Sequence, residues 1–170
     1  MTLPILASIV LPALIIGALA YYFFNAHVKN EHNRRNFELS RESRKHTLPL
    51  QLQAYERVTL FLERINPSSL LLRIKPIGQE KENYKTLLVK TIEQEYEHNL
   101  SQQIFIDEAC WNVIVSSKNA TANIVGNSAN DVNIETAQEM REEILKKMLQ
   151  TAPPSATALS MIKKEVVKLL

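Results

Sequence analysis

The first long apolar run of the chain extends from Pro4 to Phe24 and contains no charged residue. A helix of this length spans roughly 31 Å, which is close to the thickness of the hydrocarbon core of a bilayer. The sequence therefore predicts a transmembrane anchor over residues 1–25. The alternative is a cleaved signal peptide, since Ala18-Leu19-Ala20 resembles a cleavage site. No Lys or Arg precedes the run and it continues past this point, which favours the anchor.

Charged residues follow the apolar run and predict its orientation. Between residues 26 and 46 lie six basic and three acidic residues. The basic ones are Lys29, Arg34, Arg35, Arg41, Arg44 and Lys45. The positive-inside rule places the N-terminus outside and the long C-terminal part in the cytoplasm. Residues 26–46 lack Gly and Pro, so we expect a basic juxtamembrane helix or linker. Its basic residues either contact anionic lipid or only set the orientation.

Apolar residues recur at helical spacing through residues 47–170, which predicts a helical domain. The fold class expected is mainly α, with one N-terminal transmembrane helix followed by a small bundle of about four or five helices. Expected helices begin at Thr47, Glu80, Asp107, Asp131 or Asn133, and Ser155. Their expected ends are Asn66-Pro67, about Asn99, about Val125, and Pro153-Pro154. Residues 68–74 form either a short helix or a strand, and residues 76–78 form a turn.

Composition limits the class of partner. Residues 47–170 carry 14 basic and 15 acidic residues, a net charge of −1. This argues against nucleic-acid binding, which needs a clustered basic face. A single cysteine, Cys110, excludes an intrachain disulfide. Only three glycines are present, which favours helices over tight hairpins.

Two groups of residues are candidates for a metal site or a catalytic site. Glu95 and His98 lie one helical turn apart, as in di-iron bundles, but such a site needs a second pair and two further glutamates. Cys110 would need His98 as a base and a basic environment, and its neighbours in sequence are acidic. We therefore predict no catalytic residue, no metal ligand and no cofactor. A metal enzyme that uses carboxylate and His ligands is kept as an alternative.

The polar stretch from Glu93 to Gln103 is the predicted interaction surface. It is rich in Glu, His, Asn and Gln side chains, which need partners if they are buried and form a docking face if they are exposed. The candidate residues are Glu93, Glu95, Glu97, His98, Asn99, Gln102 and Gln103.

Two segments, LPLQLQAYERVTLFLERINPSSLLLRI (48–74) and EYEHNLSQQIF (95–105), are followed by a helix with Ala109 and Trp111. With the N-terminal run, they resemble an uncharacterised family of short bacterial single-pass membrane proteins. The resemblance implies a bacterial inner membrane and brings no activity or cofactor. The predicted function is a non-catalytic scaffold that tethers membrane or cytoplasmic proteins there, or alternatively a sensor of anionic lipid. Ala13 and Gly17 would allow close helix approach in a homo-oligomer.

Overall fold

The computed structural model describes residues 3–170, without the side chains of 1–16, 18, 20, 26, 28, 30, 32, 33, 36 and 40. The chain divides into two compact units, Met1–Thr47 and Leu48–Leu170. The described residues are mainly helical and contain no β-strand. The prediction of a mainly α chain is therefore confirmed.

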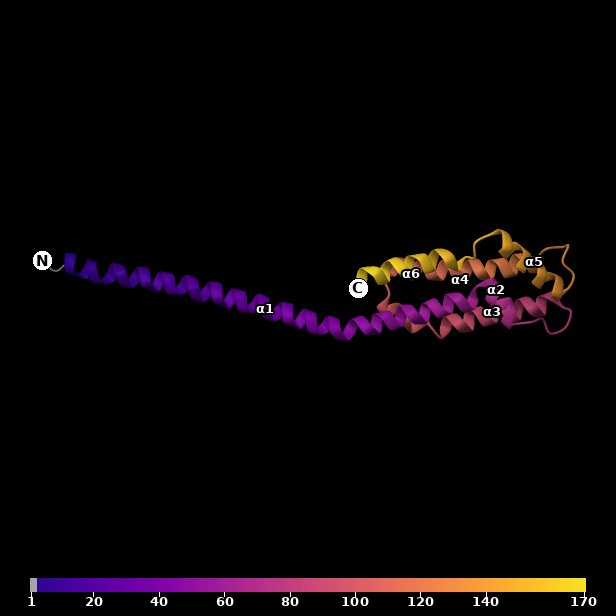
Figure 1. The fold of residues 1–170 in the computed structure, drawn as a ribbon, viewed down its shortest axis with the longest axis horizontal. Helices are drawn as coiled ribbons and strands as arrows, with labels where there is room; N and C mark the ends of the chain where they lie inside the picture. The colour runs from indigo at the N-terminus through magenta and orange to yellow at the C-terminus, as the bar shows by residue number, and fades with distance from the viewer. Residues whose placement is uncertain (1–2) are drawn as a thin grey trace. The chain divides into compact units, whose positions relative to one another are not determined.

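Helix α1 (Leu3–Ile65) supplies the described residues of the first unit (Figure 1). Thr47 was predicted to begin a helix, but the backbone on both sides of it is helical. Its hydroxyl donates a hydrogen bond to the carbonyl oxygen of Ser43 at 2.9 Å, as hydroxyls do inside helices. The predicted helix start at Thr47 is wrong, because the segment before it contains no residue that breaks a helix.

The transmembrane helix predicted over Pro4–Phe24 is contradicted. In the part of the chain that the structure describes, no helix has an apolar stretch long enough to cross a bilayer. Spanning requires about 20 consecutive, mostly apolar residues in one helix. The predicted single-pass localisation in the inner membrane rested on this helix and is therefore also contradicted. The side chains of residues 4–16, 18 and 20 lie outside the described residues.

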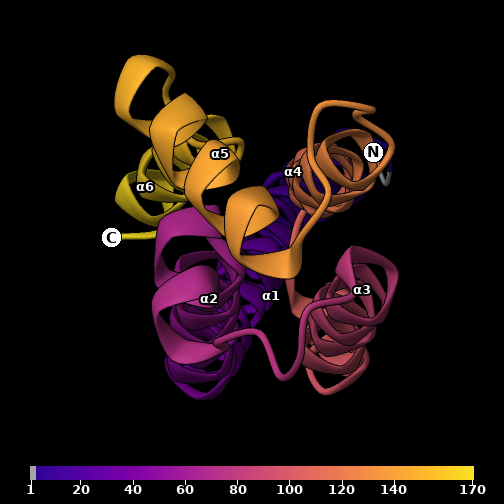
Figure 2. The same ribbon diagram turned by 90° about the vertical axis from the view of Figure 1, so that its right-hand side faces the viewer.

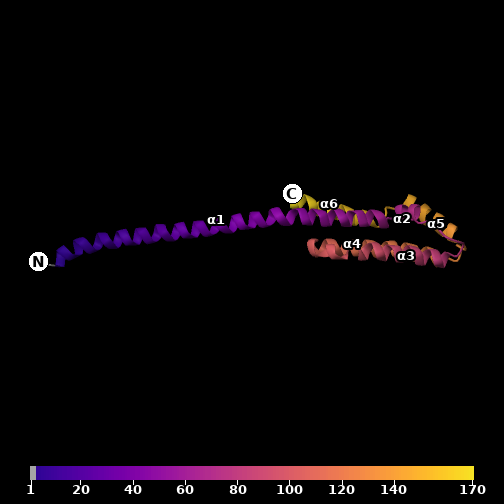
Figure 3. The same ribbon diagram turned by 90° about the horizontal axis from the view of Figure 1, so that it is seen from below.

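The second unit is built on four long helices that run alternately up and down. These are the part of α1 after residue 47, α3 (Lys81–Glu97), α4 (Glu108–Ala129) and α6 (Ser155–Leu169). Viewed end-on, α4 lies between α3 and α6 (Figure 2). The short helix α2 (Pro67–Arg73) and α5 (Ala137–Gln150) pack together at one end of the bundle (Figure 3). A 3-10 helix, η1 (Leu100–Phe105), joins α3 to α4.

The core forms where the apolar faces of these helices meet. Most of the stripe predicted for residues 48–65 is buried, including Tyr55, Val58, Phe61 and Leu62. The stripes of the later helices contribute Tyr84, Leu88, Ile92, Cys110, Ile114, Met140, Ile144 and Ile162. Burial of each large side chain stabilises the fold by about 1.5–3 kcal/mol before entropy is counted.

Several helix ends differ from the predicted ones. Asp107 caps α4 as predicted, because its carboxylate accepts from the backbone N–H groups of Ala109 and Cys110. However, α4 continues through Gly126 to Ala129. Helix α5 begins after Thr136, later than predicted, because Thr136 and Glu139 form a capping box.

Hydrogen bonds between distant segments join the end of the bundle that contains α2 and α5. The ammonium of Lys81 donates to the carbonyl oxygens of Asp131 and Ile134, at 2.9 and 2.6 Å. The guanidinium of Arg141 donates to the carbonyl oxygen of Leu71 at 3.1 Å. Pro76–Gly78 forms the predicted turn, with Gly78 at φ 87°.

Candidate interaction surface

The predicted surface begins on α3, where Glu93 faces α4. The ammonium of Lys118 donates to both carboxylate oxygens of Glu93, at 2.7 and 2.8 Å. Lys118 is 9% exposed, whereas the Glu93 side chain is 43% exposed. A buried ammonium needs a compensating charge. This ion pair therefore holds α3 and α4 in register, and Glu93 is not a free docking group.

Aromatic side chains surround the buried ammonium. The nitrogen of Lys118 lies 4.7 Å from the centroid of the Tyr96 ring, a cation–π distance. Tyr96 stacks against Trp111 of α4 with ring centroids 6.0 Å apart, and it also packs against Phe61 of α1 at 6.1 Å. This cluster connects α1, α3 and α4 directly behind the polar stretch.

Glu95 faces the opposite side of α3, towards α1 and α2. Its carboxylate oxygen Oε1 lies 2.9 Å from the guanidinium of Arg64 and 3.4 Å from that of Arg73. The Glu95 side chain is 13% exposed. Glu95 therefore joins three helices. Because its carboxylate already balances two guanidinium groups, it is a poor ligand for the metal ion considered with His98.

The remaining candidate residues, at the end of α3 and on η1, differ in their exposure. His98 is the exposed C-cap of α3, and the Asn99 side chain donates to the carbonyl oxygen of Glu95 at 2.7 Å. Gln102 is buried and donates to the hydroxyl of Ser101. Among the seven candidates, Glu97, His98 and Gln103 are exposed and the others are half-buried or buried.

Large apolar side chains are exposed beside these polar ones. On η1, Leu100 is 40% and Ile104 is 76% exposed. We define the α3–η1 surface as Glu97, His98, Leu100, Gln103 and Ile104. Contiguous apolar and polar groups on an anchored segment are typical of a protein-binding surface.

Cys110 is fully buried in the core. Burial, with smaller contributions from the carboxylates of Glu165 and Asp107, raises the pKa of the Cys110 thiol to about 11. A thiol that keeps its proton at neutral pH is a poor nucleophile. Among the described residues, no group of three or more His, Cys, Asp or Glu side chains could hold a metal ion.

The six candidate lipid-contacting residues lie on α1 in the first unit. All of them are exposed: Lys29, Arg34, Arg35, Arg41, Arg44 and Lys45. Two form ion pairs on the same helix, Arg34 with Glu38 at 3.0 Å and Lys45 with Glu42 at 3.7 Å. Exposed ion pairs of this kind are weak, so both cations remain available to a ligand.

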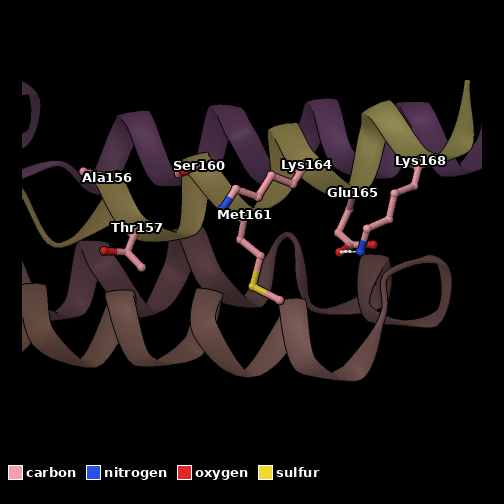
Figure 4. A pocket seen from close by; sticks show the side chains of 7 residues that line it. All are labelled: Ala156, Thr157, Ser160, Met161, Lys164, Glu165 and Lys168. Carbon is pink, nitrogen blue, oxygen red and sulfur yellow. Dashed lines mark hydrogen bonds and ion pairs between the residues drawn. The ribbon is translucent and has the colours of Figure 1, made fainter.

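A shallow hollow of about 610 Å³ lies along α6. Its lining comes from one helix and includes Ala156, Ser160 and Met161 (Figure 4). At one end, Lys168 donates to Glu165 at 2.6 Å. The small and flexible side chains form an open trough without converging polar groups, so we assign it no chemistry.

A family model described as a family of unknown function (DUF7935) matches residues 2–169. The chain belongs to this family. No curated protein and no solved structure matches it significantly. The expectation of an uncharacterised family is confirmed, whereas the match shows neither a bacterial origin nor a membrane setting.

Three residues that hold the candidate segment in place, Arg64, Arg73 and Lys118, were not predicted from the sequence. Arg64 and Arg73 reach Glu95 from segments 31 and 22 residues away in the chain. Lys118 carried a usable signal, since it lies seven residues after Trp111 and four after Ile114, which is the spacing of one helix face. A lysine on a buried stripe indicates a buried ion pair.

Proposed function

We propose that this DUF7935 protein is a non-catalytic interaction protein, a helical scaffold that binds partner proteins through the α3–η1 surface. The observation that carries the proposal is the exposure of Ile104 and Leu100 beside Glu97, His98 and Gln103. Protein interfaces usually combine apolar and polar groups in this way.

The ion pairs behind the surface support this role. Glu93 binds Lys118 of α4, and Glu95 binds Arg64 and Arg73 of α1 and α2. The α3 segment that carries the surface is therefore fixed from two sides. A surface that is already ordered loses little conformational entropy on binding, which favours affinity.

The test is capture of partners by the full-length protein after mild crosslinking in its native cells, which the resemblance proposes are bacterial. Three chains are compared: wild type, Ile104→Glu and the matched control Leu149→Glu, whose side chain is 88% exposed on α5. We expect a protein captured by wild type and the control to be lost with Ile104→Glu. Equal capture by all three chains would contradict the proposal.

A second candidate function is binding to an anionic lipid surface through residues 29–45. The exposure of all six basic side chains supports it, since each basic residue near an anionic surface contributes about 1 kcal/mol. We expect full-length protein to bind vesicles that contain anionic lipid and to release in high salt. Equal binding to neutral vesicles, or binding that salt does not weaken, would contradict it.

A further inference from the structure

A basic hollow of about 230 Å³ lies between α1 and the end of α3. Arg57, Leu60 and Arg64 line it from α1, and Glu95 and His98 line it from α3 and its cap. Leu60 is 55% exposed at this position. Glu95 is shared between Arg64 and Arg73, while no ion pair between described residues includes Arg57. The hollow therefore presents a free cation beside an apolar side chain.

A complementary hollow of about 470 Å³ lies at the start of α5. Four carboxylates line it, with Lys146 as the one cation: Asp131, Glu139, Glu142 and Glu143. Glu142 accepts a hydrogen bond from the neutral amide of Gln138, and no ion pair between described residues includes it. Val132, beside Asp131 in the chain, is 89% exposed. Each hollow thus combines an unpaired charge with a nearby exposed apolar side chain.

The two hollows of one chain are too far apart to meet. Lys81, at the start of α3, hydrogen-bonds to Asp131 and Ile134 of the acidic hollow. Glu95, which lines the basic hollow, lies 14 residues later on the same helix. At 1.5 Å per residue this separates them by about 21 Å along α3. A contact between them therefore requires two molecules.

We propose that the chain binds a second copy of itself head to tail, with the acidic face around Glu142 and Val132 of one copy packed against the basic face around Arg57 and Leu60 of the next. This goes beyond the proposed binding through the α3–η1 surface, with which the basic hollow shares only His98. Residues 47–170 carry a net charge of only −1, so repulsion between copies is small. Such a contact joins unlike surfaces and leaves each end of a dimer open to a further copy.

The test is sedimentation velocity of the full-length protein over a range of concentrations, in low and in high salt. We expect the average mass to rise with concentration in low salt and to fall again in high salt, because screening weakens charge attraction. Arg57→Glu and Glu142→Arg should each weaken association by about tenfold or more. Lys90→Glu, an exposed charge reversal outside both hollows, is the matched control and should associate like wild type.

Mixing the two variants gives the sharpest result. Arg57→Glu keeps a working acidic hollow and Glu142→Arg keeps a working basic one, so an equimolar mixture should form complexes that neither variant forms alone. A wild-type protein that stays monomeric, an association unaffected by both variants, or a mixture that forms no complex would each overturn the proposal. Arg57→Gln provides a milder variant if circular dichroism shows that Arg57→Glu is unfolded. The scaffold function is tested separately, by the capture experiment with Ile104→Glu, so its failure can be told apart from a failure of self-association.

Discussion

At the scale of single residues, two glycines differ in what the backbone requires of them. Gly78 has φ 87°, a conformation that side chains of L-residues rarely adopt, and it is the only described residue with positive φ. Gly126 lies inside α4 with helical neighbours on both sides. Neither would bring an added Cβ within 4 Å of another atom, so only backbone preference separates them.

Alanine at the two positions should therefore change stability in opposite directions. Gly78→Ala is expected to lower the free energy of unfolding by about 1 kcal/mol, because alanine strains the left-handed region. Gly126→Ala is expected to raise it by about 0.5–1 kcal/mol, because alanine is the better helix former. Urea unfolding followed by circular dichroism measures both. Changes of the same sign would contradict the turn at Gly78 or the helix at Gly126.

Cys110 should make stability fall in alkaline solution. Burial, with smaller contributions from Glu165 and Asp107, raises the pKa of its thiol from 9.0 to about 11. The folded chain then holds this proton more tightly than the unfolded chain. The stabilisation is complete below pH 9 and is lost as the pH rises from 9 towards 11.

The measurement compares wild type with Cys110→Ala, because lysines and tyrosines titrate in the same range in both chains. Between pH 8 and pH 11, the free energy of unfolding of wild type should fall by about 1–2 kcal/mol more than that of the variant. Parallel pH profiles would show that the thiol is not buried as described.

At the scale of helices, the Glu93–Lys118 pair predicts an asymmetry. Glu93→Gln leaves the buried ammonium of Lys118 without a charge partner and should cost about 1–3 kcal/mol, since Glu93 itself is partly exposed. Lys118→Met removes the buried charge and leaves Glu93 to water, so its cost should be under about 1 kcal/mol. Thermal or urea unfolding of both variants gives the comparison. An equal or reversed order would contradict the buried position of Lys118.

Helix ends could be predicted where one or two residues at the end itself determine them. Asp107 caps α4 through its own carboxylate, and the Asn66-Pro67 pair ends α1 as expected. The start of α5 was misplaced because several Asp, Asn and Thr residues compete there, and only the capping box of Thr136 with Glu139 decides among them. Gly126 was expected to end α4, but its neighbours continue to pack, with Val125 and Ala129 buried.

Composition located the candidate surface, but it did not show which of its residues are exposed. Polar density predicted the segment from Glu93 to Gln103, whereas the division into ion-paired, buried and exposed residues depends on partners far away in the chain. Arg64 reaches Glu95 only because α1 packs beside α3. Such contacts are set by tertiary packing, which spacing along one helix does not reveal.

At the scale of the whole molecule, the compact unit Leu48–Leu170 combines a rigid bundle with a surface that mixes apolar and polar groups. The ion pairs and the aromatic cluster hold the helices, while the side chains of the α3–η1 surface are exposed. We propose that this surface binds partner proteins and that the groups behind it have a structural role.

The most direct test places a photo-crosslinking amino acid at Gln103, which is exposed on the α3–η1 surface, in full-length protein in its native cells. A matched chain carries the same amino acid at Leu149, exposed on α5. The account predicts a defined crosslinked protein from position 103 that is absent from position 149. No crosslink from position 103, or the same products from both positions, would contradict the α3–η1 surface as the docking site.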